Sequence, residues 1–317
     1  MVGAYMKTRT VLRNSIVCLW AAGLVLSAVY PRASSAQAER PNGLAPIIRL
    51  GFIPGDGKVE VQKSSDELAK LIESKTGIRV VPYVGSSYGD LIDKVEKREV
   101  DLAFLSALSF VEAESRVDLK VLLKKVWDKG FYYSVLLARA DSGIRKLSDL
   151  KGKRIGLVDR KSGSGAMYPI MAMNRAKLKV PSDFKSVIYT GSHNQSVHAL
   201  KTGAVDAIAI FSNDAKGKDS AWTQHGGLLK DVRVLWASAA IPNDPLCVRS
   251  DFYESQPKLT HDFMFGLIEL NEDAKLGERF RQLLGVKSLM TATSQQYEPV
   301  REMQRELKAI SAPGENP

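Results

Sequence analysis

The sequence contains few cysteines and few histidines. Its 317 residues include two cysteines, Cys18 and Cys247, and four histidines. Because Cys18 lies in an N-terminal segment that we expect to be removed, the remaining chain can form no intramolecular disulfide. The histidines lack the paired spacing of metalloproteases, which argues against metal catalysis. We therefore predict no disulfide, no metal site and no cofactor.

Long apolar runs are also scarce, and the one near the N-terminus has the features of an export signal. Lys7, Arg9 and Arg13 precede an apolar stretch at residues 15–29, and small residues at 33–36 offer a cleavage site. This stretch is short for a membrane span. We predict a signal peptide at residues 1–36 and a periplasmic protein. An uncleaved N-terminal anchor is the alternative.

Blocks of like charge are absent, so the sequence offers no arm for binding nucleic acid. Removal of residues 1–36 takes away four basic and no acidic residues and lowers the formal net charge from +10 to +6. A weakly basic exported protein favours small anionic ligands through its overall field. We predict a small anion as the ligand and no nucleic-acid partner.

Strand and helix patterns alternate along the rest of the chain, which predicts an α/β architecture with mainly parallel sheets. About 280 residues are enough for two domains of ordinary size. A long strand at residues 132–139 and a turn at 241–245 mark the two places where we expect the chain to cross between lobes. Residues 119–126 are interpreted as an edge-side strand, and residues 260–270, 278–284 and 295–310 as helices. The predicted lobes are lobe 1 at residues 47–135 and 245–317, and lobe 2 at 136–244.

The stretch at residues 159–169 has the strongest functional signal. A buried-looking strand at 154–158 runs into it, and a helical pattern follows it. The first N–H groups of a helix have no partner within the helix and lie at the positive end of its dipole, so they can hold an oxyanion. Ser162 and Ser164 add hydroxyl donors, and Gly163 lets the backbone approach closely. The alternative is an ordinary helix cap, because the stretch matches neither a Walker A pattern nor G-x-G-x-x-G.

Tyr88, Ser106 and His193 also lie in polar turns that follow predicted strands and precede predicted helices. Ligands of open parallel sheets bind outside the carboxyl ends of the strands. If the two halves face each other, these residues converge with the serines of the 159–169 stretch on one cleft. Each has a structural alternative, Tyr88 as a boundary aromatic and the other two as helix caps. The residues alone thus indicate a two-lobed anion binder.

Seven segments, spread over nearly the whole chain after the signal, carry a family resemblance. Taken together in order and spacing, they resemble the phosphate, phosphite and phosphonate substrate-binding proteins of bacterial ABC transporters, the PhnD-like family. The resemblance implies a type II periplasmic-binding-protein fold, in which two α/β lobes joined by crossover strands close on a tetrahedral anion and present it to an ABC permease. The segments are residues 87–92, 100–105, 141–144, 149–154, 159–165, 191–193 and 241–245.

The resemblance also implies which residues bind the ligand. Members of the family hold the anion with a Ser-Thr-Ser-Gly-like turn, a tyrosine and a histidine, which correspond here to Ser162 and Ser164 with the adjacent amides, to Tyr88 and to His193. Gly163 stands where the family usually has threonine, and its backbone N–H remains. If His193 contacts the anion, we expect binding to weaken above its pKa. The predicted ligand-binding residues are Tyr88, Ser106, Ser162, Gly163, Ser164 and His193.

Catalysis is a competing interpretation, with Ser162 or Ser164 as nucleophile and His193 as base. The sequence has no G-x-S-x-G nucleophile elbow and no evident acid to orient the histidine, so we predict a binding protein and not an enzyme. The leading function is capture of a phosphonate, phosphite or phosphate for delivery to an ABC permease. A ligand-sensing module that acts on a membrane receptor is the alternative. The identity of the anion, the role of Asp244 and the oligomeric state stay open.

Overall fold

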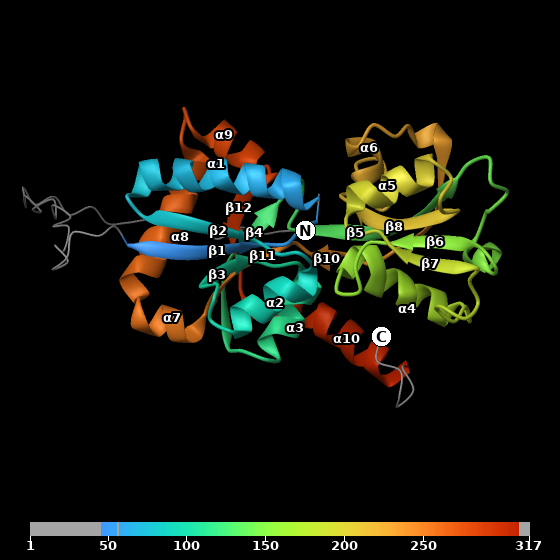
Figure 1. The fold of residues 1–317 in the computed structure, drawn as a ribbon, viewed down its shortest axis with the longest axis horizontal. Helices are drawn as coiled ribbons and strands as arrows, with labels where there is room; N and C mark the ends of the chain where they lie inside the picture. Colours follow the sequence, from blue (N-terminus) through green and yellow to red (C-terminus); the bar gives the residue numbers. More distant parts are fainter. Residues whose placement is uncertain (1–45, 56, 311–317) are drawn as a thin grey trace, which may run out of the picture. The chain divides into compact units, whose positions relative to one another are not determined.

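Two β-sheets organise the part of the chain that the structure describes. The structure is a computed structural model and describes residues 46–55 and 57–310 (Figure 1). The predicted signal peptide and Cys18 lie outside the described residues. None of the helices within them combines the length and the apolar character of a membrane span.

The first sheet combines parallel and antiparallel strands in the order β12-β4-β11-β3-β1-β2. β1 pairs in parallel with β2 and β3, whereas β11, β4 and β12 join through antiparallel pairs. Its strands are β1 (Ile47–Phe52), β2 (Arg79–Val84), β3 (Leu102–Phe104), β4 (Leu119–Val126), β11 (Pro245–Arg249) and β12 (Ser288–Thr291).

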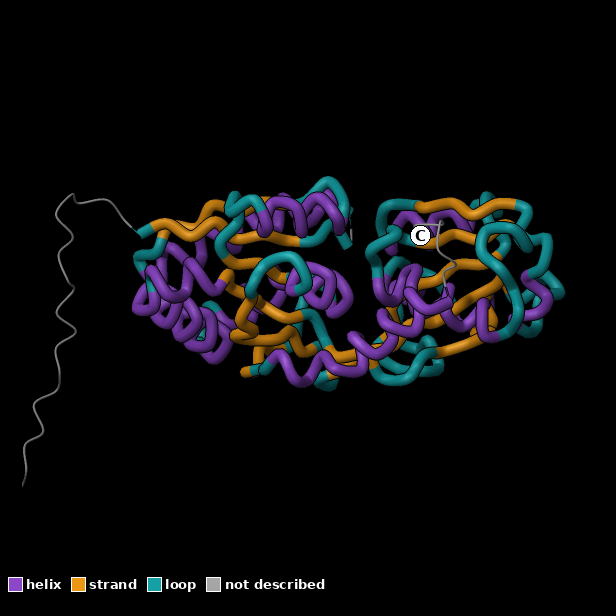
Figure 2. The backbone as a smooth tube through the Cα atoms, turned by 90° about the horizontal axis from the view of Figure 1, so that it is seen from below, coloured by secondary structure: helices purple, strands orange, loops and turns teal. Residues whose placement is uncertain are grey.

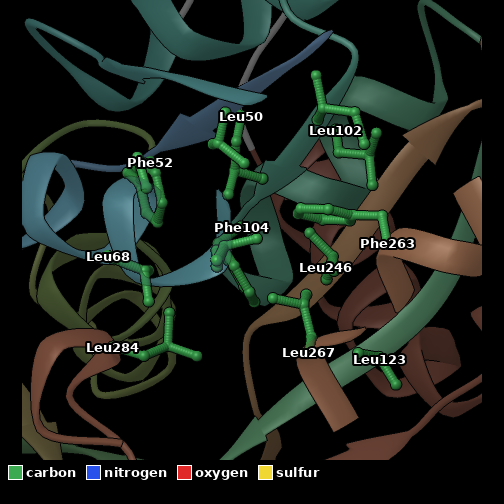
Figure 3. Close-up of a cluster of buried hydrophobic side chains, with 14 of the residues drawn as sticks. Leu50, Phe52, Leu68, Leu102, Phe104, Leu123, Leu246, Phe263, Leu267 and Leu284 are labelled. Atoms are coloured by element: carbon green, nitrogen blue, oxygen red, sulfur yellow. The ribbon is translucent and has the colours of Figure 1, made fainter. Parts of the chain in front are cut away.

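Helices cover both faces of this sheet (Figures 1 and 2). The alternate residues Leu50 and Phe52 of β1 meet Leu68 of α1 and Leu267 of α8 in one buried cluster (Figure 3), since successive strand residues point to opposite faces. Helices α2, α3 and α10 supply a second cluster. The helices of this lobe are α1 (Lys58–Thr76), α2 (Tyr88–Glu96), α3 (Ala107–Glu114), α7 (Ser250–Ser255), α8 (Pro257–Glu272), α9 (Gly277–Leu284) and α10 (Glu298–Ile310).

The second sheet has the order β10-β5-β8-β6-β7, and β9 also pairs with β5. β6 pairs in parallel with β7 and β8, whereas β5 is antiparallel to all its neighbours. Leu136 and Ile155 pack in a cluster with α4, and Val135 and Ile208 pack in another with α5 and α6. The elements are β5 (Phe131–Arg139), β6 (Arg154–Leu157), β7 (Ser186–Tyr189), β8 (Ala207–Ser212), β9 (Val232–Ala237), β10 (Ile241–Pro242), α4 (Tyr168–Arg175), α5 (His193–Lys201) and α6 (Ala221–Gln224).

Two short segments connect the sheets, residues 127–130 between β4 and β5 and residues 243–244 between β10 and β11. Asn243 ties them together, because its side-chain Nδ2 donates to the carbonyl oxygens of Lys125 at 2.9 Å and Lys129 at 2.6 Å. Its own carbonyl oxygen accepts a 2.7 Å hydrogen bond from the hydroxyl of Tyr297. The two crossings are thus held side by side, as a two-strand hinge requires.

The structure corrects three expectations about the sheets. The sheets are mixed and not mainly parallel, because the strands next to the crossings run against their neighbours. β4 is not an edge strand, since the four-residue β12, a strand that the sequence pattern does not predict, pairs outside it between two predicted helices. β5 pairs with the second sheet from Phe131 onward, so the long strand expected to cross between the lobes lies along its whole length in that sheet.

Candidate ligand-binding site

The loop after β6 has the strand, turn and helix arrangement that the sequence predicts. Ser162 caps a single π-helical turn at Gly163–Met167, which continues directly into α4. The Oγ atom of Ser162 accepts a 3.1 Å hydrogen bond from the N–H of Gly165. Ser162 and Ser164 are both buried. The helix start is therefore preformed, with N–H groups and hydroxyls gathered at one point. We call Ser162, Gly163 and Ser164 the cradle.

The two glycines of this loop differ in what surrounds them. A Cβ atom on Gly165 would lie 2.4 Å from Cβ of Val158, a distance that real side chains do not adopt. The Val158 N–H also donates to the Gly165 carbonyl oxygen at 2.9 Å, which holds the loop against the end of β6. A Cβ on Gly163 would meet its nearest neighbour, Leu108 of α3, at an ordinary 3.5 Å. Only Gly165 is required by the packing.

His193 is the first residue of α5 and joins the cavity wall opposite lobe 1. Its backbone N–H donates to the carbonyl oxygen of Gly55 in lobe 1 at 3.0 Å, so the lobes touch directly here. Its ring is 5 % exposed and packs edge-on against Phe211, with centroids 4.9 Å apart. The Nδ1 atom accepts a 3.4 Å hydrogen bond from the N–H of Phe211, which leaves Nε2 to carry the proton.

Burial, reinforced by the charge of His225, lowers the pKa of His193 to about 3. The imidazole is therefore neutral at physiological pH and can donate one hydrogen bond, from Nε2. Because the ring does not change charge near neutral pH, any weakening of binding above the pKa of His193 falls at acid pH and not in the neutral range. The reason is the fully enclosed position of the ring, which the sequence does not reveal.

Lobe 1 contributes Tyr88 and Ser106, both at helix starts. Tyr88 is the first residue of α2 and is 2 % exposed, with its hydroxyl beside Gly55. Ser106 caps α3: its Oγ accepts a 3.1 Å hydrogen bond from the Ser109 N–H and lies 2.8 Å from the Ser109 Oγ, to which it donates. The cap interpretation of Ser106 is thus confirmed, although the residue also lies on the cavity wall.

All six predicted residues line one cavity of about 350 Å³. They come from both lobes and from four different helix starts or turns, so the structure brings together residues up to 105 positions apart. Hydroxyls, an imidazole and backbone N–H groups are the donors that they offer. The predicted residues on the wall are Tyr88, Ser106, Ser162, Gly163, Ser164 and His193.

Sequence reasoning missed much of the rest of the wall. Tyr132 is buried beside Ser164, and burial together with the nearby charge of Asp244 raises its pKa well above the usual value, so its hydroxyl stays protonated. Asp244 itself is 8 % exposed and lies on the wall. No motif marks Tyr132, whereas Asp244 belongs to the 241–245 segment of the family resemblance, which leaves its role open. Further lining residues include Phe52, Glu60, Phe104, Lys125, Trp127 and Phe211.

Lys125 is the only basic side chain on this wall among the residues that the structure describes, whereas Glu60 and Asp244 are acidic. No three His, Cys, Asp or Glu side chains within the described part of the chain are grouped so as to hold a metal ion. Neutral donors thus dominate the cradle. Such donors recognise an oxyanion by hydrogen bonds to its charge and not by ion pairing.

Two α/β lobes joined by paired crossings, with a donor-lined cavity between them, define the class of periplasmic binding proteins. A family model described as "ABC transporter, phosphonate, periplasmic substrate-binding protein" matches residues 50–297. The chain belongs to this family of phosphonate-binding substrate-binding proteins of ABC transporters. The prediction that it is a binding protein and not an enzyme is confirmed by that membership.

Individual relatives agree with this assignment. The phosphonates-binding periplasmic protein of Escherichia coli is 27% identical over 279 residues, which cover 85% of this chain and 78% of the relative. The phosphate-import protein PhnD of Mycolicibacterium smegmatis is 29% identical over 198 residues, covering 59% of this chain and 62% of the relative. The crystal structure of PhnD1 from Prochlorococcus marinus with methylphosphonate has a TM-score of 0.71 at 18% identity, covering 83% of this chain and 98% of that one. This likeness confirms the predicted fold.

Proposed function

We propose that the protein captures a phosphorus oxyanion in the cradle and delivers it to an ABC permease. Phosphonates are the first candidates, and phosphite and phosphate are the alternatives. The observation that carries the proposal is the convergence of Tyr88, the cradle serines and His193 on one cavity. The relatives support phosphonates and phosphate as candidates, since one is named for binding phosphonates and one for phosphate import, and the solved structure contains methylphosphonate.

The anion is held by groups whose protonation does not change near neutral pH. The cradle supplies the N–H groups of the first turn and the hydroxyl of Ser164, and His193 donates from Nε2. Tyr132 stays protonated as a further donor. A hydrogen bond to a charged oxygen in such a buried site contributes about 1.5–3 kcal/mol. Because a ligand that contacts both lobes favours the closed arrangement, binding and closure are coupled.

A thermal-shift screen tests the proposal with phosphate, phosphite, methylphosphonate, 2-aminoethylphosphonate and sulfate. A ligand that binds only the folded protein raises its melting temperature. We expect at least one phosphorus oxyanion to raise it and sulfate to do so less. The screen is repeated on Ser164→Ala, which removes a cradle hydroxyl, and on Ser148→Ala, which changes an exposed serine outside the cavity.

The expected result is a shift that Ser164→Ala loses and Ser148→Ala retains. A shift that persists in full in Ser164→Ala places the ligand elsewhere. No shift with any phosphorus oxyanion contradicts the proposed function altogether.

Delivery and export are parts of the same proposal. Residues 1–36 direct export and are removed, so mass spectrometry of the protein from a periplasmic extract should give an N-terminus at Gln37. Cells that lack the protein should take up radiolabelled methylphosphonate more slowly than complemented cells, and complementation with Ser164→Ala should restore uptake poorly. Uptake that is unchanged by deletion contradicts delivery to a permease.

A further inference from the structure

The cavity is larger than a bare phosphorus oxyanion needs. Its volume of about 350 Å³ falls in the range of sites for organic ligands, roughly 300–1,000 Å³. A water molecule takes up about 30 Å³ in the liquid, so an ion of four or five heavy atoms leaves most of this space unfilled. The cradle accounts for three of the lining residues, and the remaining wall is built from other residues.

About half of that remaining wall is aromatic or aliphatic, and Ser64, Ser65, Gln224 and Gln282 are among its polar residues. Trp127 packs edge-on against Tyr132, with centroids 5.9 Å apart, and Tyr132 in turn lies beside Ser164 of the cradle. Phe52 and Phe104 stack on each other at 5.8 Å and also face the cavity. The remaining apolar lining residues are Ile53, Val61, Phe211, Leu283 and Leu284. We call Trp127, Phe52, Phe104 and Phe211 the aromatic wall.

Trp127 is held in a fixed position. Its indole N–H donates a 2.6 Å hydrogen bond to the carbonyl oxygen of Gly285, which follows α9. A buried or half-buried tryptophan whose N–H has a partner presents a rigid face for stacking. Because the crossing at 127–130 leads from Trp127 directly into β5, which carries Tyr132, this face lies near the cradle.

Trp127 of the aromatic wall also borders a second hollow. Trp127, Gly285, Gln224 of lobe 2 and Gln282 of lobe 1 line both the cavity and an adjoining open hollow of about 470 Å³. A substituent that reaches Trp127 from an anion in the cradle therefore lies at the border of this open hollow, whose other lining residues are mostly polar or charged.

Charged groups on the wall are compatible with a π-bearing substituent. The Nζ atom of Lys125 lies 5.1 Å from the centroid of the Phe104 ring, so a cation already faces aromatic surface in this region. Glu60 and Asp244 are the two acids on the wall. They disfavour a second negative charge on the substituent near them.

We propose that the preferred ligand is a phosphonate with an aromatic or bulky apolar substituent, which packs along the aromatic wall against Trp127. The inference rests on the proposed function, since the cradle must hold the phosphonate group. The inference adds to that function a division of the site into two parts. The cradle binds any phosphorus oxyanion, and the aromatic wall selects among them by their substituents.

Isothermal titration of the mature protein with phosphite, methylphosphonate, 2-aminoethylphosphonate, phosphonoacetate, phenylphosphonate and benzylphosphonate tests this. We expect phenyl- or benzylphosphonate to bind about tenfold more tightly than methylphosphonate, because stacking adds to burial of apolar area. In Trp127→Ala this ratio should fall to threefold or less. The matched control is Phe265→Ala, which removes an exposed aromatic ring of α8 outside the cavity and should keep the ratio.

The ratio is measured within each variant, so a partly unfolded Trp127→Ala sample does not distort it. Tighter binding of phosphite, methylphosphonate, 2-aminoethylphosphonate or phosphonoacetate than of either aromatic ligand overturns the inference and leaves the proposed function intact. An unchanged ratio in Trp127→Ala also overturns it. Failure of every phosphorus oxyanion to bind overturns the proposed function and the inference with it.

Discussion

Donor groups and aromatic rings form two different parts of the cavity wall, although Tyr88 and Ser106 of lobe 1 are also donors and Phe211 of lobe 2 also belongs to the aromatic wall. Lobe 2 presents the cradle and His193, where the donors are backbone N–H groups, hydroxyls and a neutral imidazole. Lobe 1 and the first crossing present the rings of Phe52, Phe104 and Trp127. Hydrogen-bond donors at fixed positions bind the charged oxygens that all phosphorus oxyanions share. An apolar surface contacts the substituent on phosphorus, which differs from one anion to another. The contrast teaches that affinity for the anion and choice among anions can be changed separately.

The largest effect should come from the loop that forms the lobe 2 wall. Gly165→Ala places a Cβ against Val158 and forces the cradle off the end of β6. Overpacking of this kind costs about 1–3 kcal/mol or more, and we expect measurable ligand binding to be lost. Urea denaturation measures the loss of stability, and titration calorimetry measures the loss of ligand binding. Gly163→Ala, two residues earlier in the same loop, should change the free energy of unfolding by less than about 1 kcal/mol, because the added Cβ atom meets only ordinary van der Waals contacts. Equal damage by the two variants contradicts the packing described for the loop.

Ser164→Ala should weaken binding of every phosphorus oxyanion by a similar factor, about 10- to 100-fold, because one hydrogen bond to charge is lost. The free energy of unfolding should change little. Titration of several ligands distinguishes this uniform loss from a selective one. If Ser164→Ala alters the preference between methylphosphonate and phenylphosphonate, the cradle also selects among substituents, and the separate roles given to the cradle and the aromatic wall are wrong.

The neutral state of His193 predicts a pH dependence of stability and not of binding. Its pKa is about 3 in the folded protein and near 6.5 in the unfolded chain, so between these values the unfolded state binds more protons. The stabilising contribution is complete above pH 6.5 and is lost as the pH falls toward 3, at about 1 kcal/mol per pH unit. Unfolding of the wild type between pH 4 and 6 should follow this slope, and His193→Gln should flatten it.

Between pH 6 and 8 the ratio of wild-type to His193→Gln affinity for methylphosphonate should stay constant, because the ligand's own ionisation affects both proteins equally. A ratio that falls steadily as the pH rises through this range indicates that a charged imidazole binds the anion, contrary to the geometry at Phe211.

The smallest effect on binding is expected from Ser106 of lobe 1. Its Oγ is already engaged as the cap of α3 by the N–H and hydroxyl of Ser109. Ser106→Ala should therefore cost about 1 kcal/mol of stability through loss of the cap and change ligand affinity less than threefold. Thermal unfolding and titration of the same samples check this. A tenfold loss of affinity without loss of stability indicates that Ser106 donates to the ligand.

The sequence is most informative where the site is local. Ser162 and Ser164 follow a strand and precede a helix within a dozen residues, so their place at a helix start follows from propensity alone. The same reasoning places Tyr88 and His193 at helix starts. That they share a cavity follows from the order of strands and helices and from the family resemblance.

Other features depend on contacts between distant segments. Trp127 and Gly285 are 158 residues apart, and nothing near either one indicates that the indole is fixed by that carbonyl group. β12 is only four residues long and exists as a strand because it pairs with β4, so its own sequence carries little signal. The neutral state of His193 depends on burial and on the charge of His225, and its tautomer depends on the Phe211 N–H. Tertiary contacts determine all three.

A crystal structure of the mature protein with methylphosphonate tests the central claim most directly. We predict that the phosphonate oxygens lie within hydrogen-bond distance of the Ser164 hydroxyl, the N–H groups of the cradle and Nε2 of His193, with the methyl group directed toward Trp127. A phosphonate group held instead by Lys125, with the cradle unoccupied, would contradict the account.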